Sequence, residues 1–514
     1  MSLAPKTPSL RLPIRPLTPL HLLTALTLLL VLGYNASLWQ LIWQQPYASN
    51  VQRLVFCTAF LSFMAAVIQL CLNPFAWPRL IKPLAAMLLI SAAAVTHFID
   101  NYGVVIDKTM VQNLFETDTT EAADMLNMQL LFDVLLKGVL PAALIIMIPI
   151  RQQPARSVLN AQLLSLLCCL VLIGGNAALL YKDYSSLFRN HREIRNLAVP
   201  SNYLYYSARY LAGAYAPVDR TFQTLGTDAA LQPVSSEQSQ KPDLLVVVLG
   251  ETARSQNFSL NGYPRDTNPE LAQHAVTSFS NVEACGTSTA VSVPCMFSLQ
   301  TRDQYDEEQT TYQSNVLDIL QHTGIQVLWR DNNSGCKGVC TRIKHESADQ
   351  FNIEHDCANQ ECFDEQMLSG LQEWLATHTG TAVIVLHQKG SHGPAYYKRV
   401  PEAYTRFTPV CDSNQLQSCS QATITNAYDN TIRYTDHLLS QVIDFLQQQN
   451  ETHNTAMLYI SDHGESLGEN NLYLHGMPWL MAPDEQKKVP LITCLSRCPC
   501  RHALGSWCDC WTAG

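Results

Sequence analysis

The stretch Leu244-Leu-Val-Val-Val-Leu-Gly-Glu-Thr252 decides the fold that the sequence predicts. Its apolar residues follow one another without alternation, and a glycine followed by a carboxylate ends the run. A short run that is apolar on both faces is typical of a buried strand in a parallel sheet. Met457–Ile460 has the same pattern and ends in Ser461-Asp-His-Gly464. We therefore expect both strands to deliver polar side chains at the edge where open α/β sheets place their chemistry.

The chain from about Asp243 onward alternates strand and helix patterns. The other strand candidates are Ile325–Trp329, Val383–Leu386 and Val489–Ile492, and the helix candidates are Ser314–Gln321, Asp364–Thr377 and Asn426–Gln448. This order predicts a mostly parallel sheet with helices on both faces.

The chain before about Tyr181 predicts a bundle of five transmembrane helices. Each candidate is close to the roughly 20 residues that a bilayer requires, although the third is short. The candidates are Leu20–Leu41, Leu54–Leu72, Leu84–Ile99, Leu130–Ile150 and Leu159–Leu180. We interpret the first as a retained helix, because no small-residue cleavage site of a signal peptide follows it. Asp133 and Lys137 in the fourth span are i, i+4 partners that either pair inside the bundle or extend toward the membrane surface.

The loop charges predict the orientation of this bundle. One side carries Lys6, Arg11, Arg15, Arg79, Lys82, Arg151 and Arg156, and the other carries Arg53 and Lys108 among acidic residues. The positive-inside rule then places the N-terminus in the cytoplasm and everything after Tyr181 outside. Most of the 17 cysteines follow that point, as expected in an oxidising compartment. The net charge of -10 gives no indication of nucleic-acid binding.

These patterns divide the chain into four parts. Residues 1–180 form the transmembrane domain, 181–242 form helices and a linker, 243–493 form the catalytic domain, and 494–514 form a cysteine-rich tail. The tyrosines and arginines of the second part favour helices on the membrane surface, and a soluble bridging helix is the alternative.

Candidate metal ligands follow the predicted strands. Glu251 and the pair Asp462 and His463 come directly after strands, and three histidines lie nearby in the sequence. These three are His387, His392 and His475. A mixed set of carboxylates and imidazoles suits zinc, and an open coordination position suits catalysis. A single histidine of this kind is more often a hydrogen-bonded or surface residue, but several acids and imidazoles at strand ends indicate a metal site.

A candidate nucleophile lies in Glu283-Ala-Cys-Gly-Thr-Ser-Thr-Ala-Val-Ser-Val-Pro-Cys-Met-Phe-Ser298. Thr289 is the preferred residue, and Thr287 and Ser288 are also plausible from the sequence. Coordination to zinc would favour the alkoxide of a threonine that is otherwise a weak nucleophile. A helix that begins near Ser288 would also favour a bound phosphate at its N-terminus. The alternative is that these hydroxyls only cap a helix.

Two further patterns surround these candidates. Cysteines in close pairs predict local disulfides, with a zinc knuckle as the alternative for the second pair. The pairs are Cys285/Cys295, Cys336/Cys340, Cys357/Cys362 and Cys411/Cys419. In the polar loop of residues 100–129, Asn113, Thr117 and Glu121 would form one stripe on a helix, which without other evidence is a solvated face.

Taken together, the motifs of the chain resemble those of the lipid A phosphoethanolamine transferases. This family belongs to the alkaline phosphatase and sulfatase superfamily and includes the mobile colistin-resistance enzymes. The matching segments are Leu249-Gly-Glu-Thr-Ala-Arg254, Asn261-Gly-Tyr-Pro-Arg265, Cys285-Gly-Thr-Ser-Thr-Ala290, Ser292-Val-Pro-Cys-Met-Phe297, His387-Gln-Lys-Gly-Ser-His-Gly-Pro-Ala395 and Ser461-Asp-His-Gly-Glu-Ser466. The resemblance covers about Leu20 to Ile492 and implies five transmembrane helices with a periplasmic zinc domain.

The resemblance also implies roles for individual residues. Thr289 would be the nucleophile and a ligand of zinc together with Glu251, Asp462 and His463. His392 and His475 would bind phosphate or a second zinc ion, with His387 as a weaker match. The head group of phosphoethanolamine would contact Asn113, Thr117, Glu121, Ser334 and Lys337. Of these, Glu121 would meet the amine and Lys337 the phosphate.

The implied reaction is a two-step transfer in the bacterial inner membrane. Thr289 takes phosphoethanolamine from phosphatidylethanolamine, and lipid A then takes it from the phosphothreonine. The product would weaken binding of polymyxins, and we expect a monomer among membrane lipids. The alternatives are transfer of phosphoethanolamine or phosphoglycerol to another glycan, plain hydrolysis, or an inactive membrane protein.

The tail departs from the family pattern after Thr493. It carries Cys494, Cys498, Cys500, Cys508 and Cys510 without a strand or helix period. We expect it to result from a shifted reading frame, with a small zinc knuckle or a disulfide-bonded lid as alternatives. On this hypothesis the strand Val489–Ile492 would have an uncovered edge.

Overall fold

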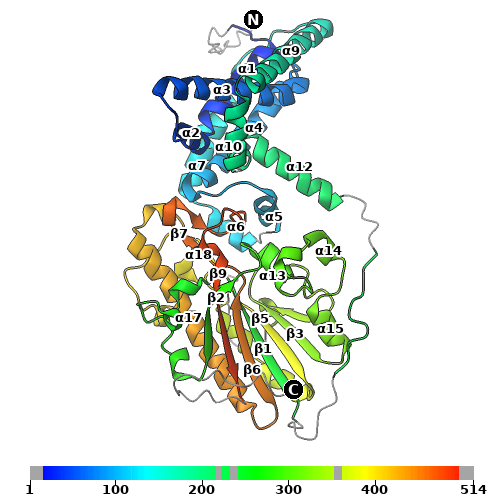
Figure 1. The fold of residues 1–514 in the computed structure, drawn as a ribbon, viewed down its shortest axis with the longest axis vertical. Helices are drawn as coiled ribbons and strands as arrows, with labels where there is room; N and C mark the ends of the chain where they lie inside the picture. The colour runs from blue at the N-terminus through cyan, green and yellow to red at the C-terminus, as the bar shows by residue number, and fades with distance from the viewer. Residues whose placement is uncertain are drawn as a thin grey trace, which may run out of the picture. The chain divides into compact units, whose positions relative to one another are not determined.

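The computed structural model describes residues 15–116, 119–191, 193–215, 221–231, 241–351 and 362–496, which fall into two compact units (Figure 1). The first unit comprises the chain up to Lys108 together with Leu126–Ala212. The second comprises Thr109–Met125 and the chain from Gly213 onward. The loop between the third and fourth predicted spans therefore belongs, by its contacts, to the catalytic unit.

The first unit contains all five predicted spans. Four are long and apolar enough to cross a membrane, and a bent pair of helices makes the fifth if its two helices count as one span. The bent pair is α1 (Pro19–Gly33) with α2 (Ala36–Trp43), and the others are α3 (Asn50–Leu72), α4 (Ile81–Tyr102), the run of α7 (Met128–Asp133), η2 (Val134–Val139) and α8 (Leu140–Met147), and α9 (Ala155–Leu179). The third span, which is short in the sequence prediction, extends over 22 residues. Three further helices follow: α10 (Tyr181–Asn190), α11 (Ile194–Leu197) and α12 (Ser201–Tyr215).

The first span differs from the single helix that the sequence predicts. Its two helices meet at an angle of 63°. The break lies at Asn35, whose side-chain amide donates hydrogen bonds to the carbonyls of Leu30 and Val199. The Asn35 side-chain oxygen also accepts from the Val199 amide at 2.9 Å. One of these bonds adds a partner to the Leu30 carbonyl at the end of α1, and the other two fix Asn35 to Val199, so side-chain hydrogen bonds accompany the bend.

The polar pair of the fourth span does form. The Lys137 ammonium lies 2.9 Å from one Asp133 oxygen, and His97 lies 2.8 Å from the other. The Asp133 side chain is 11% exposed, whereas that of Lys137 is 44% exposed. The carboxylate is therefore paired inside the unit, as one of the two sequence interpretations expects.

The second unit is built on a seven-stranded sheet in the order β2-β9-β6-β1-β5-β3-β4. The strands are β1 (Asp243–Gly250), β2 (Thr277–Glu283), β3 (Gln326–Asp331), β4 (Lys344–Ser347), β5 (Ala382–His387), β6 (Asn454–Ser461) and β9 (Lys488–Leu495). Only β9 runs against its neighbours, because it pairs antiparallel with both β2 and β6. A two-stranded sheet of β7 (Ser466–Leu467) and β8 (Tyr473–Leu474) lies apart.

The register of the central strands brings their carboxyl ends to one edge. Gly250 of β1 lies opposite Ser461 of β6, and Leu249 lies opposite His387 of β5. The residues that follow these positions therefore leave the sheet side by side. Because β1 and β5 are buried on both faces, their sequences are apolar without alternation.

Helices pack against this sheet, as Figure 1 shows for α17 (Gln421–Gln448) and α15 (Val316–His322). The first packs on β6 and the second on β3. The remaining helices are α5 (Lys108–Glu116), α6 (Thr119–Met125), α13 (Thr289–Met296), α14 (Glu307–Thr311), α16 (Leu371–Thr377) and α18 (Asp484–Lys487). The predicted helix Asp364–Thr377 is wrong in one respect. A 3₁₀ segment, Asp364–Leu368, precedes α16, and Gly370 between them has a φ of 72°, which a helix interior does not allow.

Two expectations about the strands are corrected. The sequence prediction omits β2 and β4, whose residues are mostly exposed and polar. The predicted uncovered edge at Val489–Ile492 is also wrong for the described residues, because β9 has a partner on each side. The tail from residue 497 onward, with four of its cysteines, lies outside the described residues.

Candidate active site

Three predicted ligands meet at the carboxyl edge of the sheet. Glu251 follows β1, and Asp462 and His463 follow β6. All three are fully buried, and their ligand atoms lie within 4.8 Å of one another. The prediction that these side chains converge is therefore confirmed by the geometry.

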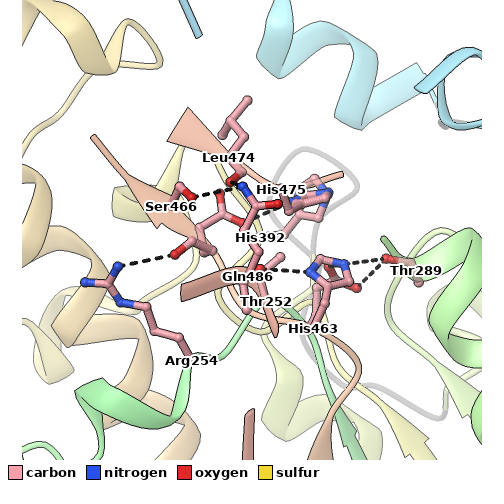
Figure 2. Close-up of polar contacts among 12 residues, drawn as sticks. Thr252, Arg254, Thr289, His392, His463, Ser466, Leu474, His475 and Gln486 are labelled. Carbon is pink, nitrogen blue, oxygen red and sulfur yellow. Dashed lines mark hydrogen bonds and ion pairs between the residues drawn. The ribbon is translucent and has the colours of Figure 1, made fainter. Parts of the chain in front are cut away.

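Thr289 is the first residue of α13 and lies against this group (Figure 2). Its hydroxyl oxygen is 3.1 Å from Glu251 Oε2 and 3.3 Å from His463 Nε2. The other two candidate hydroxyls lie elsewhere. That of Thr287 donates to the carbonyl of Met477 at 2.6 Å, and that of Ser288 has no hydrogen-bond partner among the described residues. Among the described residues, only Thr289 of these three makes a hydrogen bond to the candidate ligands, and it lies at a helix N-terminus that favours an anion.

The three ligand candidates fit a bound cation. His463 Nδ1 lies 3.0 Å from the carbonyl of Gly464, which can only accept, so Nδ1 carries the proton. The lone pair of Nε2 then faces Glu251 Oε1 and Asp462 Oδ2, each at 3.4 Å. Within the described part of the chain neither of these two buried oxygens has a hydrogen-bond donor. Three electron-rich atoms that face one another in this way are suited to hold a positive ion between them, and this donor set fits zinc.

Burial and the surrounding charges shift the pKa values of this group. Burial, with the nearby Glu251 charge, raises the pKa of Asp462 well above its ordinary range. Burial alone would also raise the pKa of Glu251, but His463 and the other site histidines lower it overall. Burial lowers the pKa of His463 to about 3, so its imidazole is neutral and available as a ligand.

A second group contains Glu251 with His392 and His475, the two histidines being labelled in Figure 2. The His475 ring lies 4.4 Å from the His463 ring and 5.5 Å from the His392 ring, between centroids. Glu465, fully buried, accepts from His475 Nδ1 at 2.9 Å and from the Tyr396 hydroxyl at 2.8 Å. Burial alone would lower the pKa of His475, but the Glu465 charge and hydrogen bond outweigh it and raise the pKa to about 9. His475 is therefore cationic near neutral pH and suited to a phosphate oxygen.

His387 has other neighbours than the sequence interpretation expects. It belongs to neither group of candidate ligands formed by the described residues. Its Nδ1 lies 2.9 Å from Asp331 Oδ2, and its Nε2 lies 3.3 Å from the side-chain amide of Asn333. The same amide donates to Glu251 Oε2 at 2.6 Å. His387 thus helps to orient Asn333, and Asn333 helps to orient Glu251.

The set of site residues predicted from the sequence omits Asp331, Asn333 and Glu465. Signals for them are present, because Asp331 to Ser334 follow a predicted strand and Glu465 lies in the segment after His463. It also omits Asp364, which accepts from the backbone amides of Lys389 and Gly390 and from the Asn332 side chain. No local pattern marks that residue, because its partners come from two other loops.

The loops around the site contain the expected disulfides. Bonds join Cys285 to Cys295, Cys336 to Cys340, and Cys411 to Cys419, so the zinc knuckle at the second pair is excluded. Cys362 is disulfide-bonded, and Cys357 lies outside the described residues. In the second of these loops, Lys337 donates to the hydroxyl and carbonyl of Ser334, both at 3.1 Å.

The predicted head-group stripe is described in part. A Cβ added at Gly476, next to His475, would lie 3.6 Å from the side-chain nitrogen of Asn113. Asn113 is therefore close to the second group of ligand candidates. Thr117 and the side chain of Glu121 lie outside the described residues.

Known proteins resemble both units. Residues 243–497 match the family model described as Sulfatase, and residues 63–215 match that described as Phosphoethanolamine transferase EptA/EptB. Phosphoethanolamine transferase EptA of Escherichia coli K12 is 44% identical over 85% of this chain and 79% of its own. Phosphatidylethanolamine transferase Mcr-1 from E. coli is 38% identical over 93% and 89%. The structure of lipooligosaccharide phosphoethanolamine transferase A from Neisseria meningitidis superposes with a TM-score of 0.86, at 34% identity over 94% and 90% of the two chains.

The catalytic unit thus has the sulfatase type of fold, in the alkaline phosphatase superfamily, and it follows a set of apolar helices. The relatives narrow this class, because their identity to the chain extends over both units. The chain belongs to the EptA/EptB family of phosphoethanolamine transferases. It is an inner-membrane protein with a C-terminal periplasmic catalytic domain.

Proposed function

We propose that this enzyme transfers phosphoethanolamine from phosphatidylethanolamine to a phosphate of lipid A, with Thr289 as the nucleophile. The relatives named above are phosphoethanolamine or phosphatidylethanolamine transferases, and another, from E. coli K12, is named for Kdo(2)-lipid A as its acceptor. The observation that carries the proposal is the place of the Thr289 hydroxyl, 3.1 Å from Glu251 and 3.3 Å from His463 at the start of α13.

The reaction proceeds in two displacements at phosphorus. The Thr289 oxygen attacks the donor phosphate, the bond from phosphorus to the diacylglycerol oxygen breaks, and diacylglycerol leaves with a proton. An oxygen of a lipid A phosphate then attacks the phosphothreonine, and the Thr289 oxygen leaves and regains a proton. Phosphorus keeps its oxidation state throughout, so no redox partner is needed.

Glu251, Thr289, Asp462 and His463 would hold zinc, and His392 with His475 would hold donor phosphate or a second zinc ion. A bound zinc ion supplies positive charge that favours the ionised threonine hydroxyl. His475, held cationic by Glu465, neutralises a phosphate oxygen. The N-terminus of α13 adds backbone N–H groups toward the same charge. Asn113, Ser334 and Lys337, with Thr117 and Glu121, are proposed to hold the phosphoethanolamine head group.

The expected consequence is a less anionic outer membrane. Each transfer attaches a zwitterionic phosphoethanolamine to an anionic phosphate, and the added ammonium lowers the net negative charge, so the membrane attracts polycationic polymyxins such as colistin less strongly. Cells that express this chain should therefore tolerate more colistin than cells that express an inactive variant.

Mass spectrometry of lipid A from expressing cells tests the proposal. We expect phosphoethanolamine on lipid A with the unaltered chain and with Ser288→Ala, and none with Thr289→Ala. Ser288→Ala is the matched control, because it removes the adjacent hydroxyl, which has no hydrogen-bond partner among the described residues. Modified lipid A in cells with Thr289→Ala would contradict the nucleophile. Free phosphoethanolamine without modified lipid A would indicate hydrolysis instead.

A further inference from the structure

The segment of α5 and α6 contacts the rest of the catalytic unit at two places. At its start, a Cβ on Gly476 would lie 3.5 Å from Met110 Cε and 3.6 Å from Asn113 Nδ2, so α5 lies against the residue that follows His475. At its end, Asp124 of α6 lies against the residues that follow the segment of His392. The segment is therefore fixed beside each of the two site histidines.

The second contact is a carboxylate between two cations. Lys398 Nζ lies 2.5 Å from Asp124 Oδ1, and Arg399 Nη2 lies 2.6 Å from Asp124 Oδ2. The side chains of Asp124 and Arg399 are 4% and 3% exposed, so solvent screens this pair little. Burial alone would raise the pKa of Asp124, but the hydrogen bonds and charges of Lys398 and Arg399 lower it below its ordinary value.

The backbone of Asp124 is held as well. The side-chain amide of Asn414 donates to the Asp124 carbonyl at 2.8 Å. Asn414 lies in the loop that the Cys411–Cys419 disulfide closes. Since both the side chain and the backbone of Asp124 have partners from this unit, the end of α6 has one defined position there.

Arg399 connects this contact to the active site. Its Nε donates to the backbone carbonyl of His392 at 3.1 Å while its Nη2 holds Asp124. One guanidinium thus joins the end of α6 to the residue that provides one of the site imidazoles. Because a guanidinium is planar and rigid, a shift of Asp124 is transmitted to this connection.

We propose that Asp124 is a positioning residue that holds the α5–α6 segment against the His392 and His475 side of the site and thereby sets the affinity for the phospholipid donor. The inference rests on the proposed function, because it assumes that this side receives the phosphoethanolamine head group. Asp124 itself acts through α6 and Arg399 and has no part in the reacting atoms. Loss of its charge removes the ion pairs that Lys398 and Arg399 make with Asp124 and releases the segment.

The experiment compares Asp124→Asn with Glu116→Gln in the full-length protein in detergent micelles. Glu116 is the matched control, because it also lies in this segment but accepts a hydrogen bond from Gln112 of the same helix, α5. The first reaction step is followed by intact-protein mass spectrometry at increasing concentrations of phosphatidylethanolamine. Hydrogen exchange of residues 119–125 and the zinc content are measured on the same samples.

We expect Asp124→Asn to raise the KM for the donor about ten-fold, as when only about a tenth of the molecules keep the segment in place. The kcat and the zinc content should change little, and the amides of α6 should exchange faster. Asp124→Glu, which keeps the charge, should recover most of the affinity, and Glu116→Gln should match the unaltered chain.

Two results would overturn the inference: unchanged exchange of α6 in Asp124→Asn, or a lower kcat with an unchanged KM. If the unaltered chain consumes no phosphatidylethanolamine, the proposed function fails instead. The exchange measurement still reports on the contact in that case, so the two failures are distinguishable.

Discussion

Replacement of Gly390 by alanine should displace the metal-ligand candidate Glu251. Gly390 lies in the loop after β5 with a φ of 53°. A Cβ there would lie 2.8 Å from the carbonyl oxygen and 3.0 Å from the amide nitrogen of Glu251. The Ser391 amide donates to that same carbonyl at 3.0 Å, and the Gly390 amide donates to Asp364 at 2.9 Å. Neither backbone can move away without loss of these bonds.

The expected cost has two parts. A left-handed backbone costs an alanine roughly 1–2 kcal/mol. Overlap with backbone atoms that cannot yield costs roughly 1–3 kcal/mol more. The sum of about 2–5 kcal/mol corresponds, for a domain of this size, to a fall in melting temperature on the order of 10 °C. The same overlap should move the Glu251 carboxylate and reduce the bound metal.

Alanine variants at two other glycines distinguish the cost of the left-handed backbone from the cost of overlap with Glu251. Gly262 has a φ of 95° with no atom near an added Cβ, so Gly262→Ala carries the backbone term alone. Gly380 has neither a positive φ nor a neighbour, so Gly380→Ala carries neither term. Thermal unfolding and zinc analysis of the full-length variants in detergent measure all three. If Gly390→Ala melts no lower than Gly262→Ala and keeps its zinc, the argument from contact with Glu251 is refuted.

Two further predictions concern metal and pH. Exhaustive chelation should abolish donor consumption and lower the melting temperature, because Glu251 and Asp462 then face each other without a cation. Added Zn²⁺ should restore both the activity and the melting temperature. An active metal-free protein would contradict this prediction. Burial raises the pKa of Asp436 to about 7, so its folded state binds the proton more tightly than the unfolded chain. That stability is fully present below about pH 4 and is lost as the pH rises through about 7. Between pH 5 and pH 8 the free energy of unfolding should therefore fall by ~3 kcal/mol in the unaltered chain, and this fall should be strongly reduced in Asp436→Asn.

The sequence predicts the centre of the sheet better than its edges. β1, β5 and β6 are apolar runs because neighbours bury them, and each predicted run lies inside an observed strand. β2 and β4 lie at the two ends of the sheet order and are largely exposed, so their residues are polar and give no strand signal. β9 has an apolar run but pairs on both sides, which no sequence pattern specifies.

The residues of the candidate site differ in the same way in how far the sequence predicts them. Glu251, Asp462 and His463 are predictable because parallel strands bring their carboxyl ends together. The partners that orient the site come from elsewhere: Asp124 and Arg399 are 275 positions apart, and Asn333 and Glu251 are 82 apart. Such pairs depend on how loops are placed on the sheet, and no local periodicity records that placement.

Buried carboxylates in this unit differ in what compensates their charge. Each oxygen of Asp331 and Asp364 accepts hydrogen bonds. The donors to Asp331 are Trp329, His387, Asn333 and Gly335. The donors to Asp364 are Asn332, Gln388, Lys389 and Gly390. Glu251 Oε1 and Asp462 Oδ2, equally buried, have no donor among the described residues. Since an uncompensated buried charge is costly, these two oxygens are suited to a bound cation. A sequence contains all four acids without distinguishing them. The missing donors, which only the three-dimensional structure reveals, separate the acids that are suited to a metal site from those that support a loop.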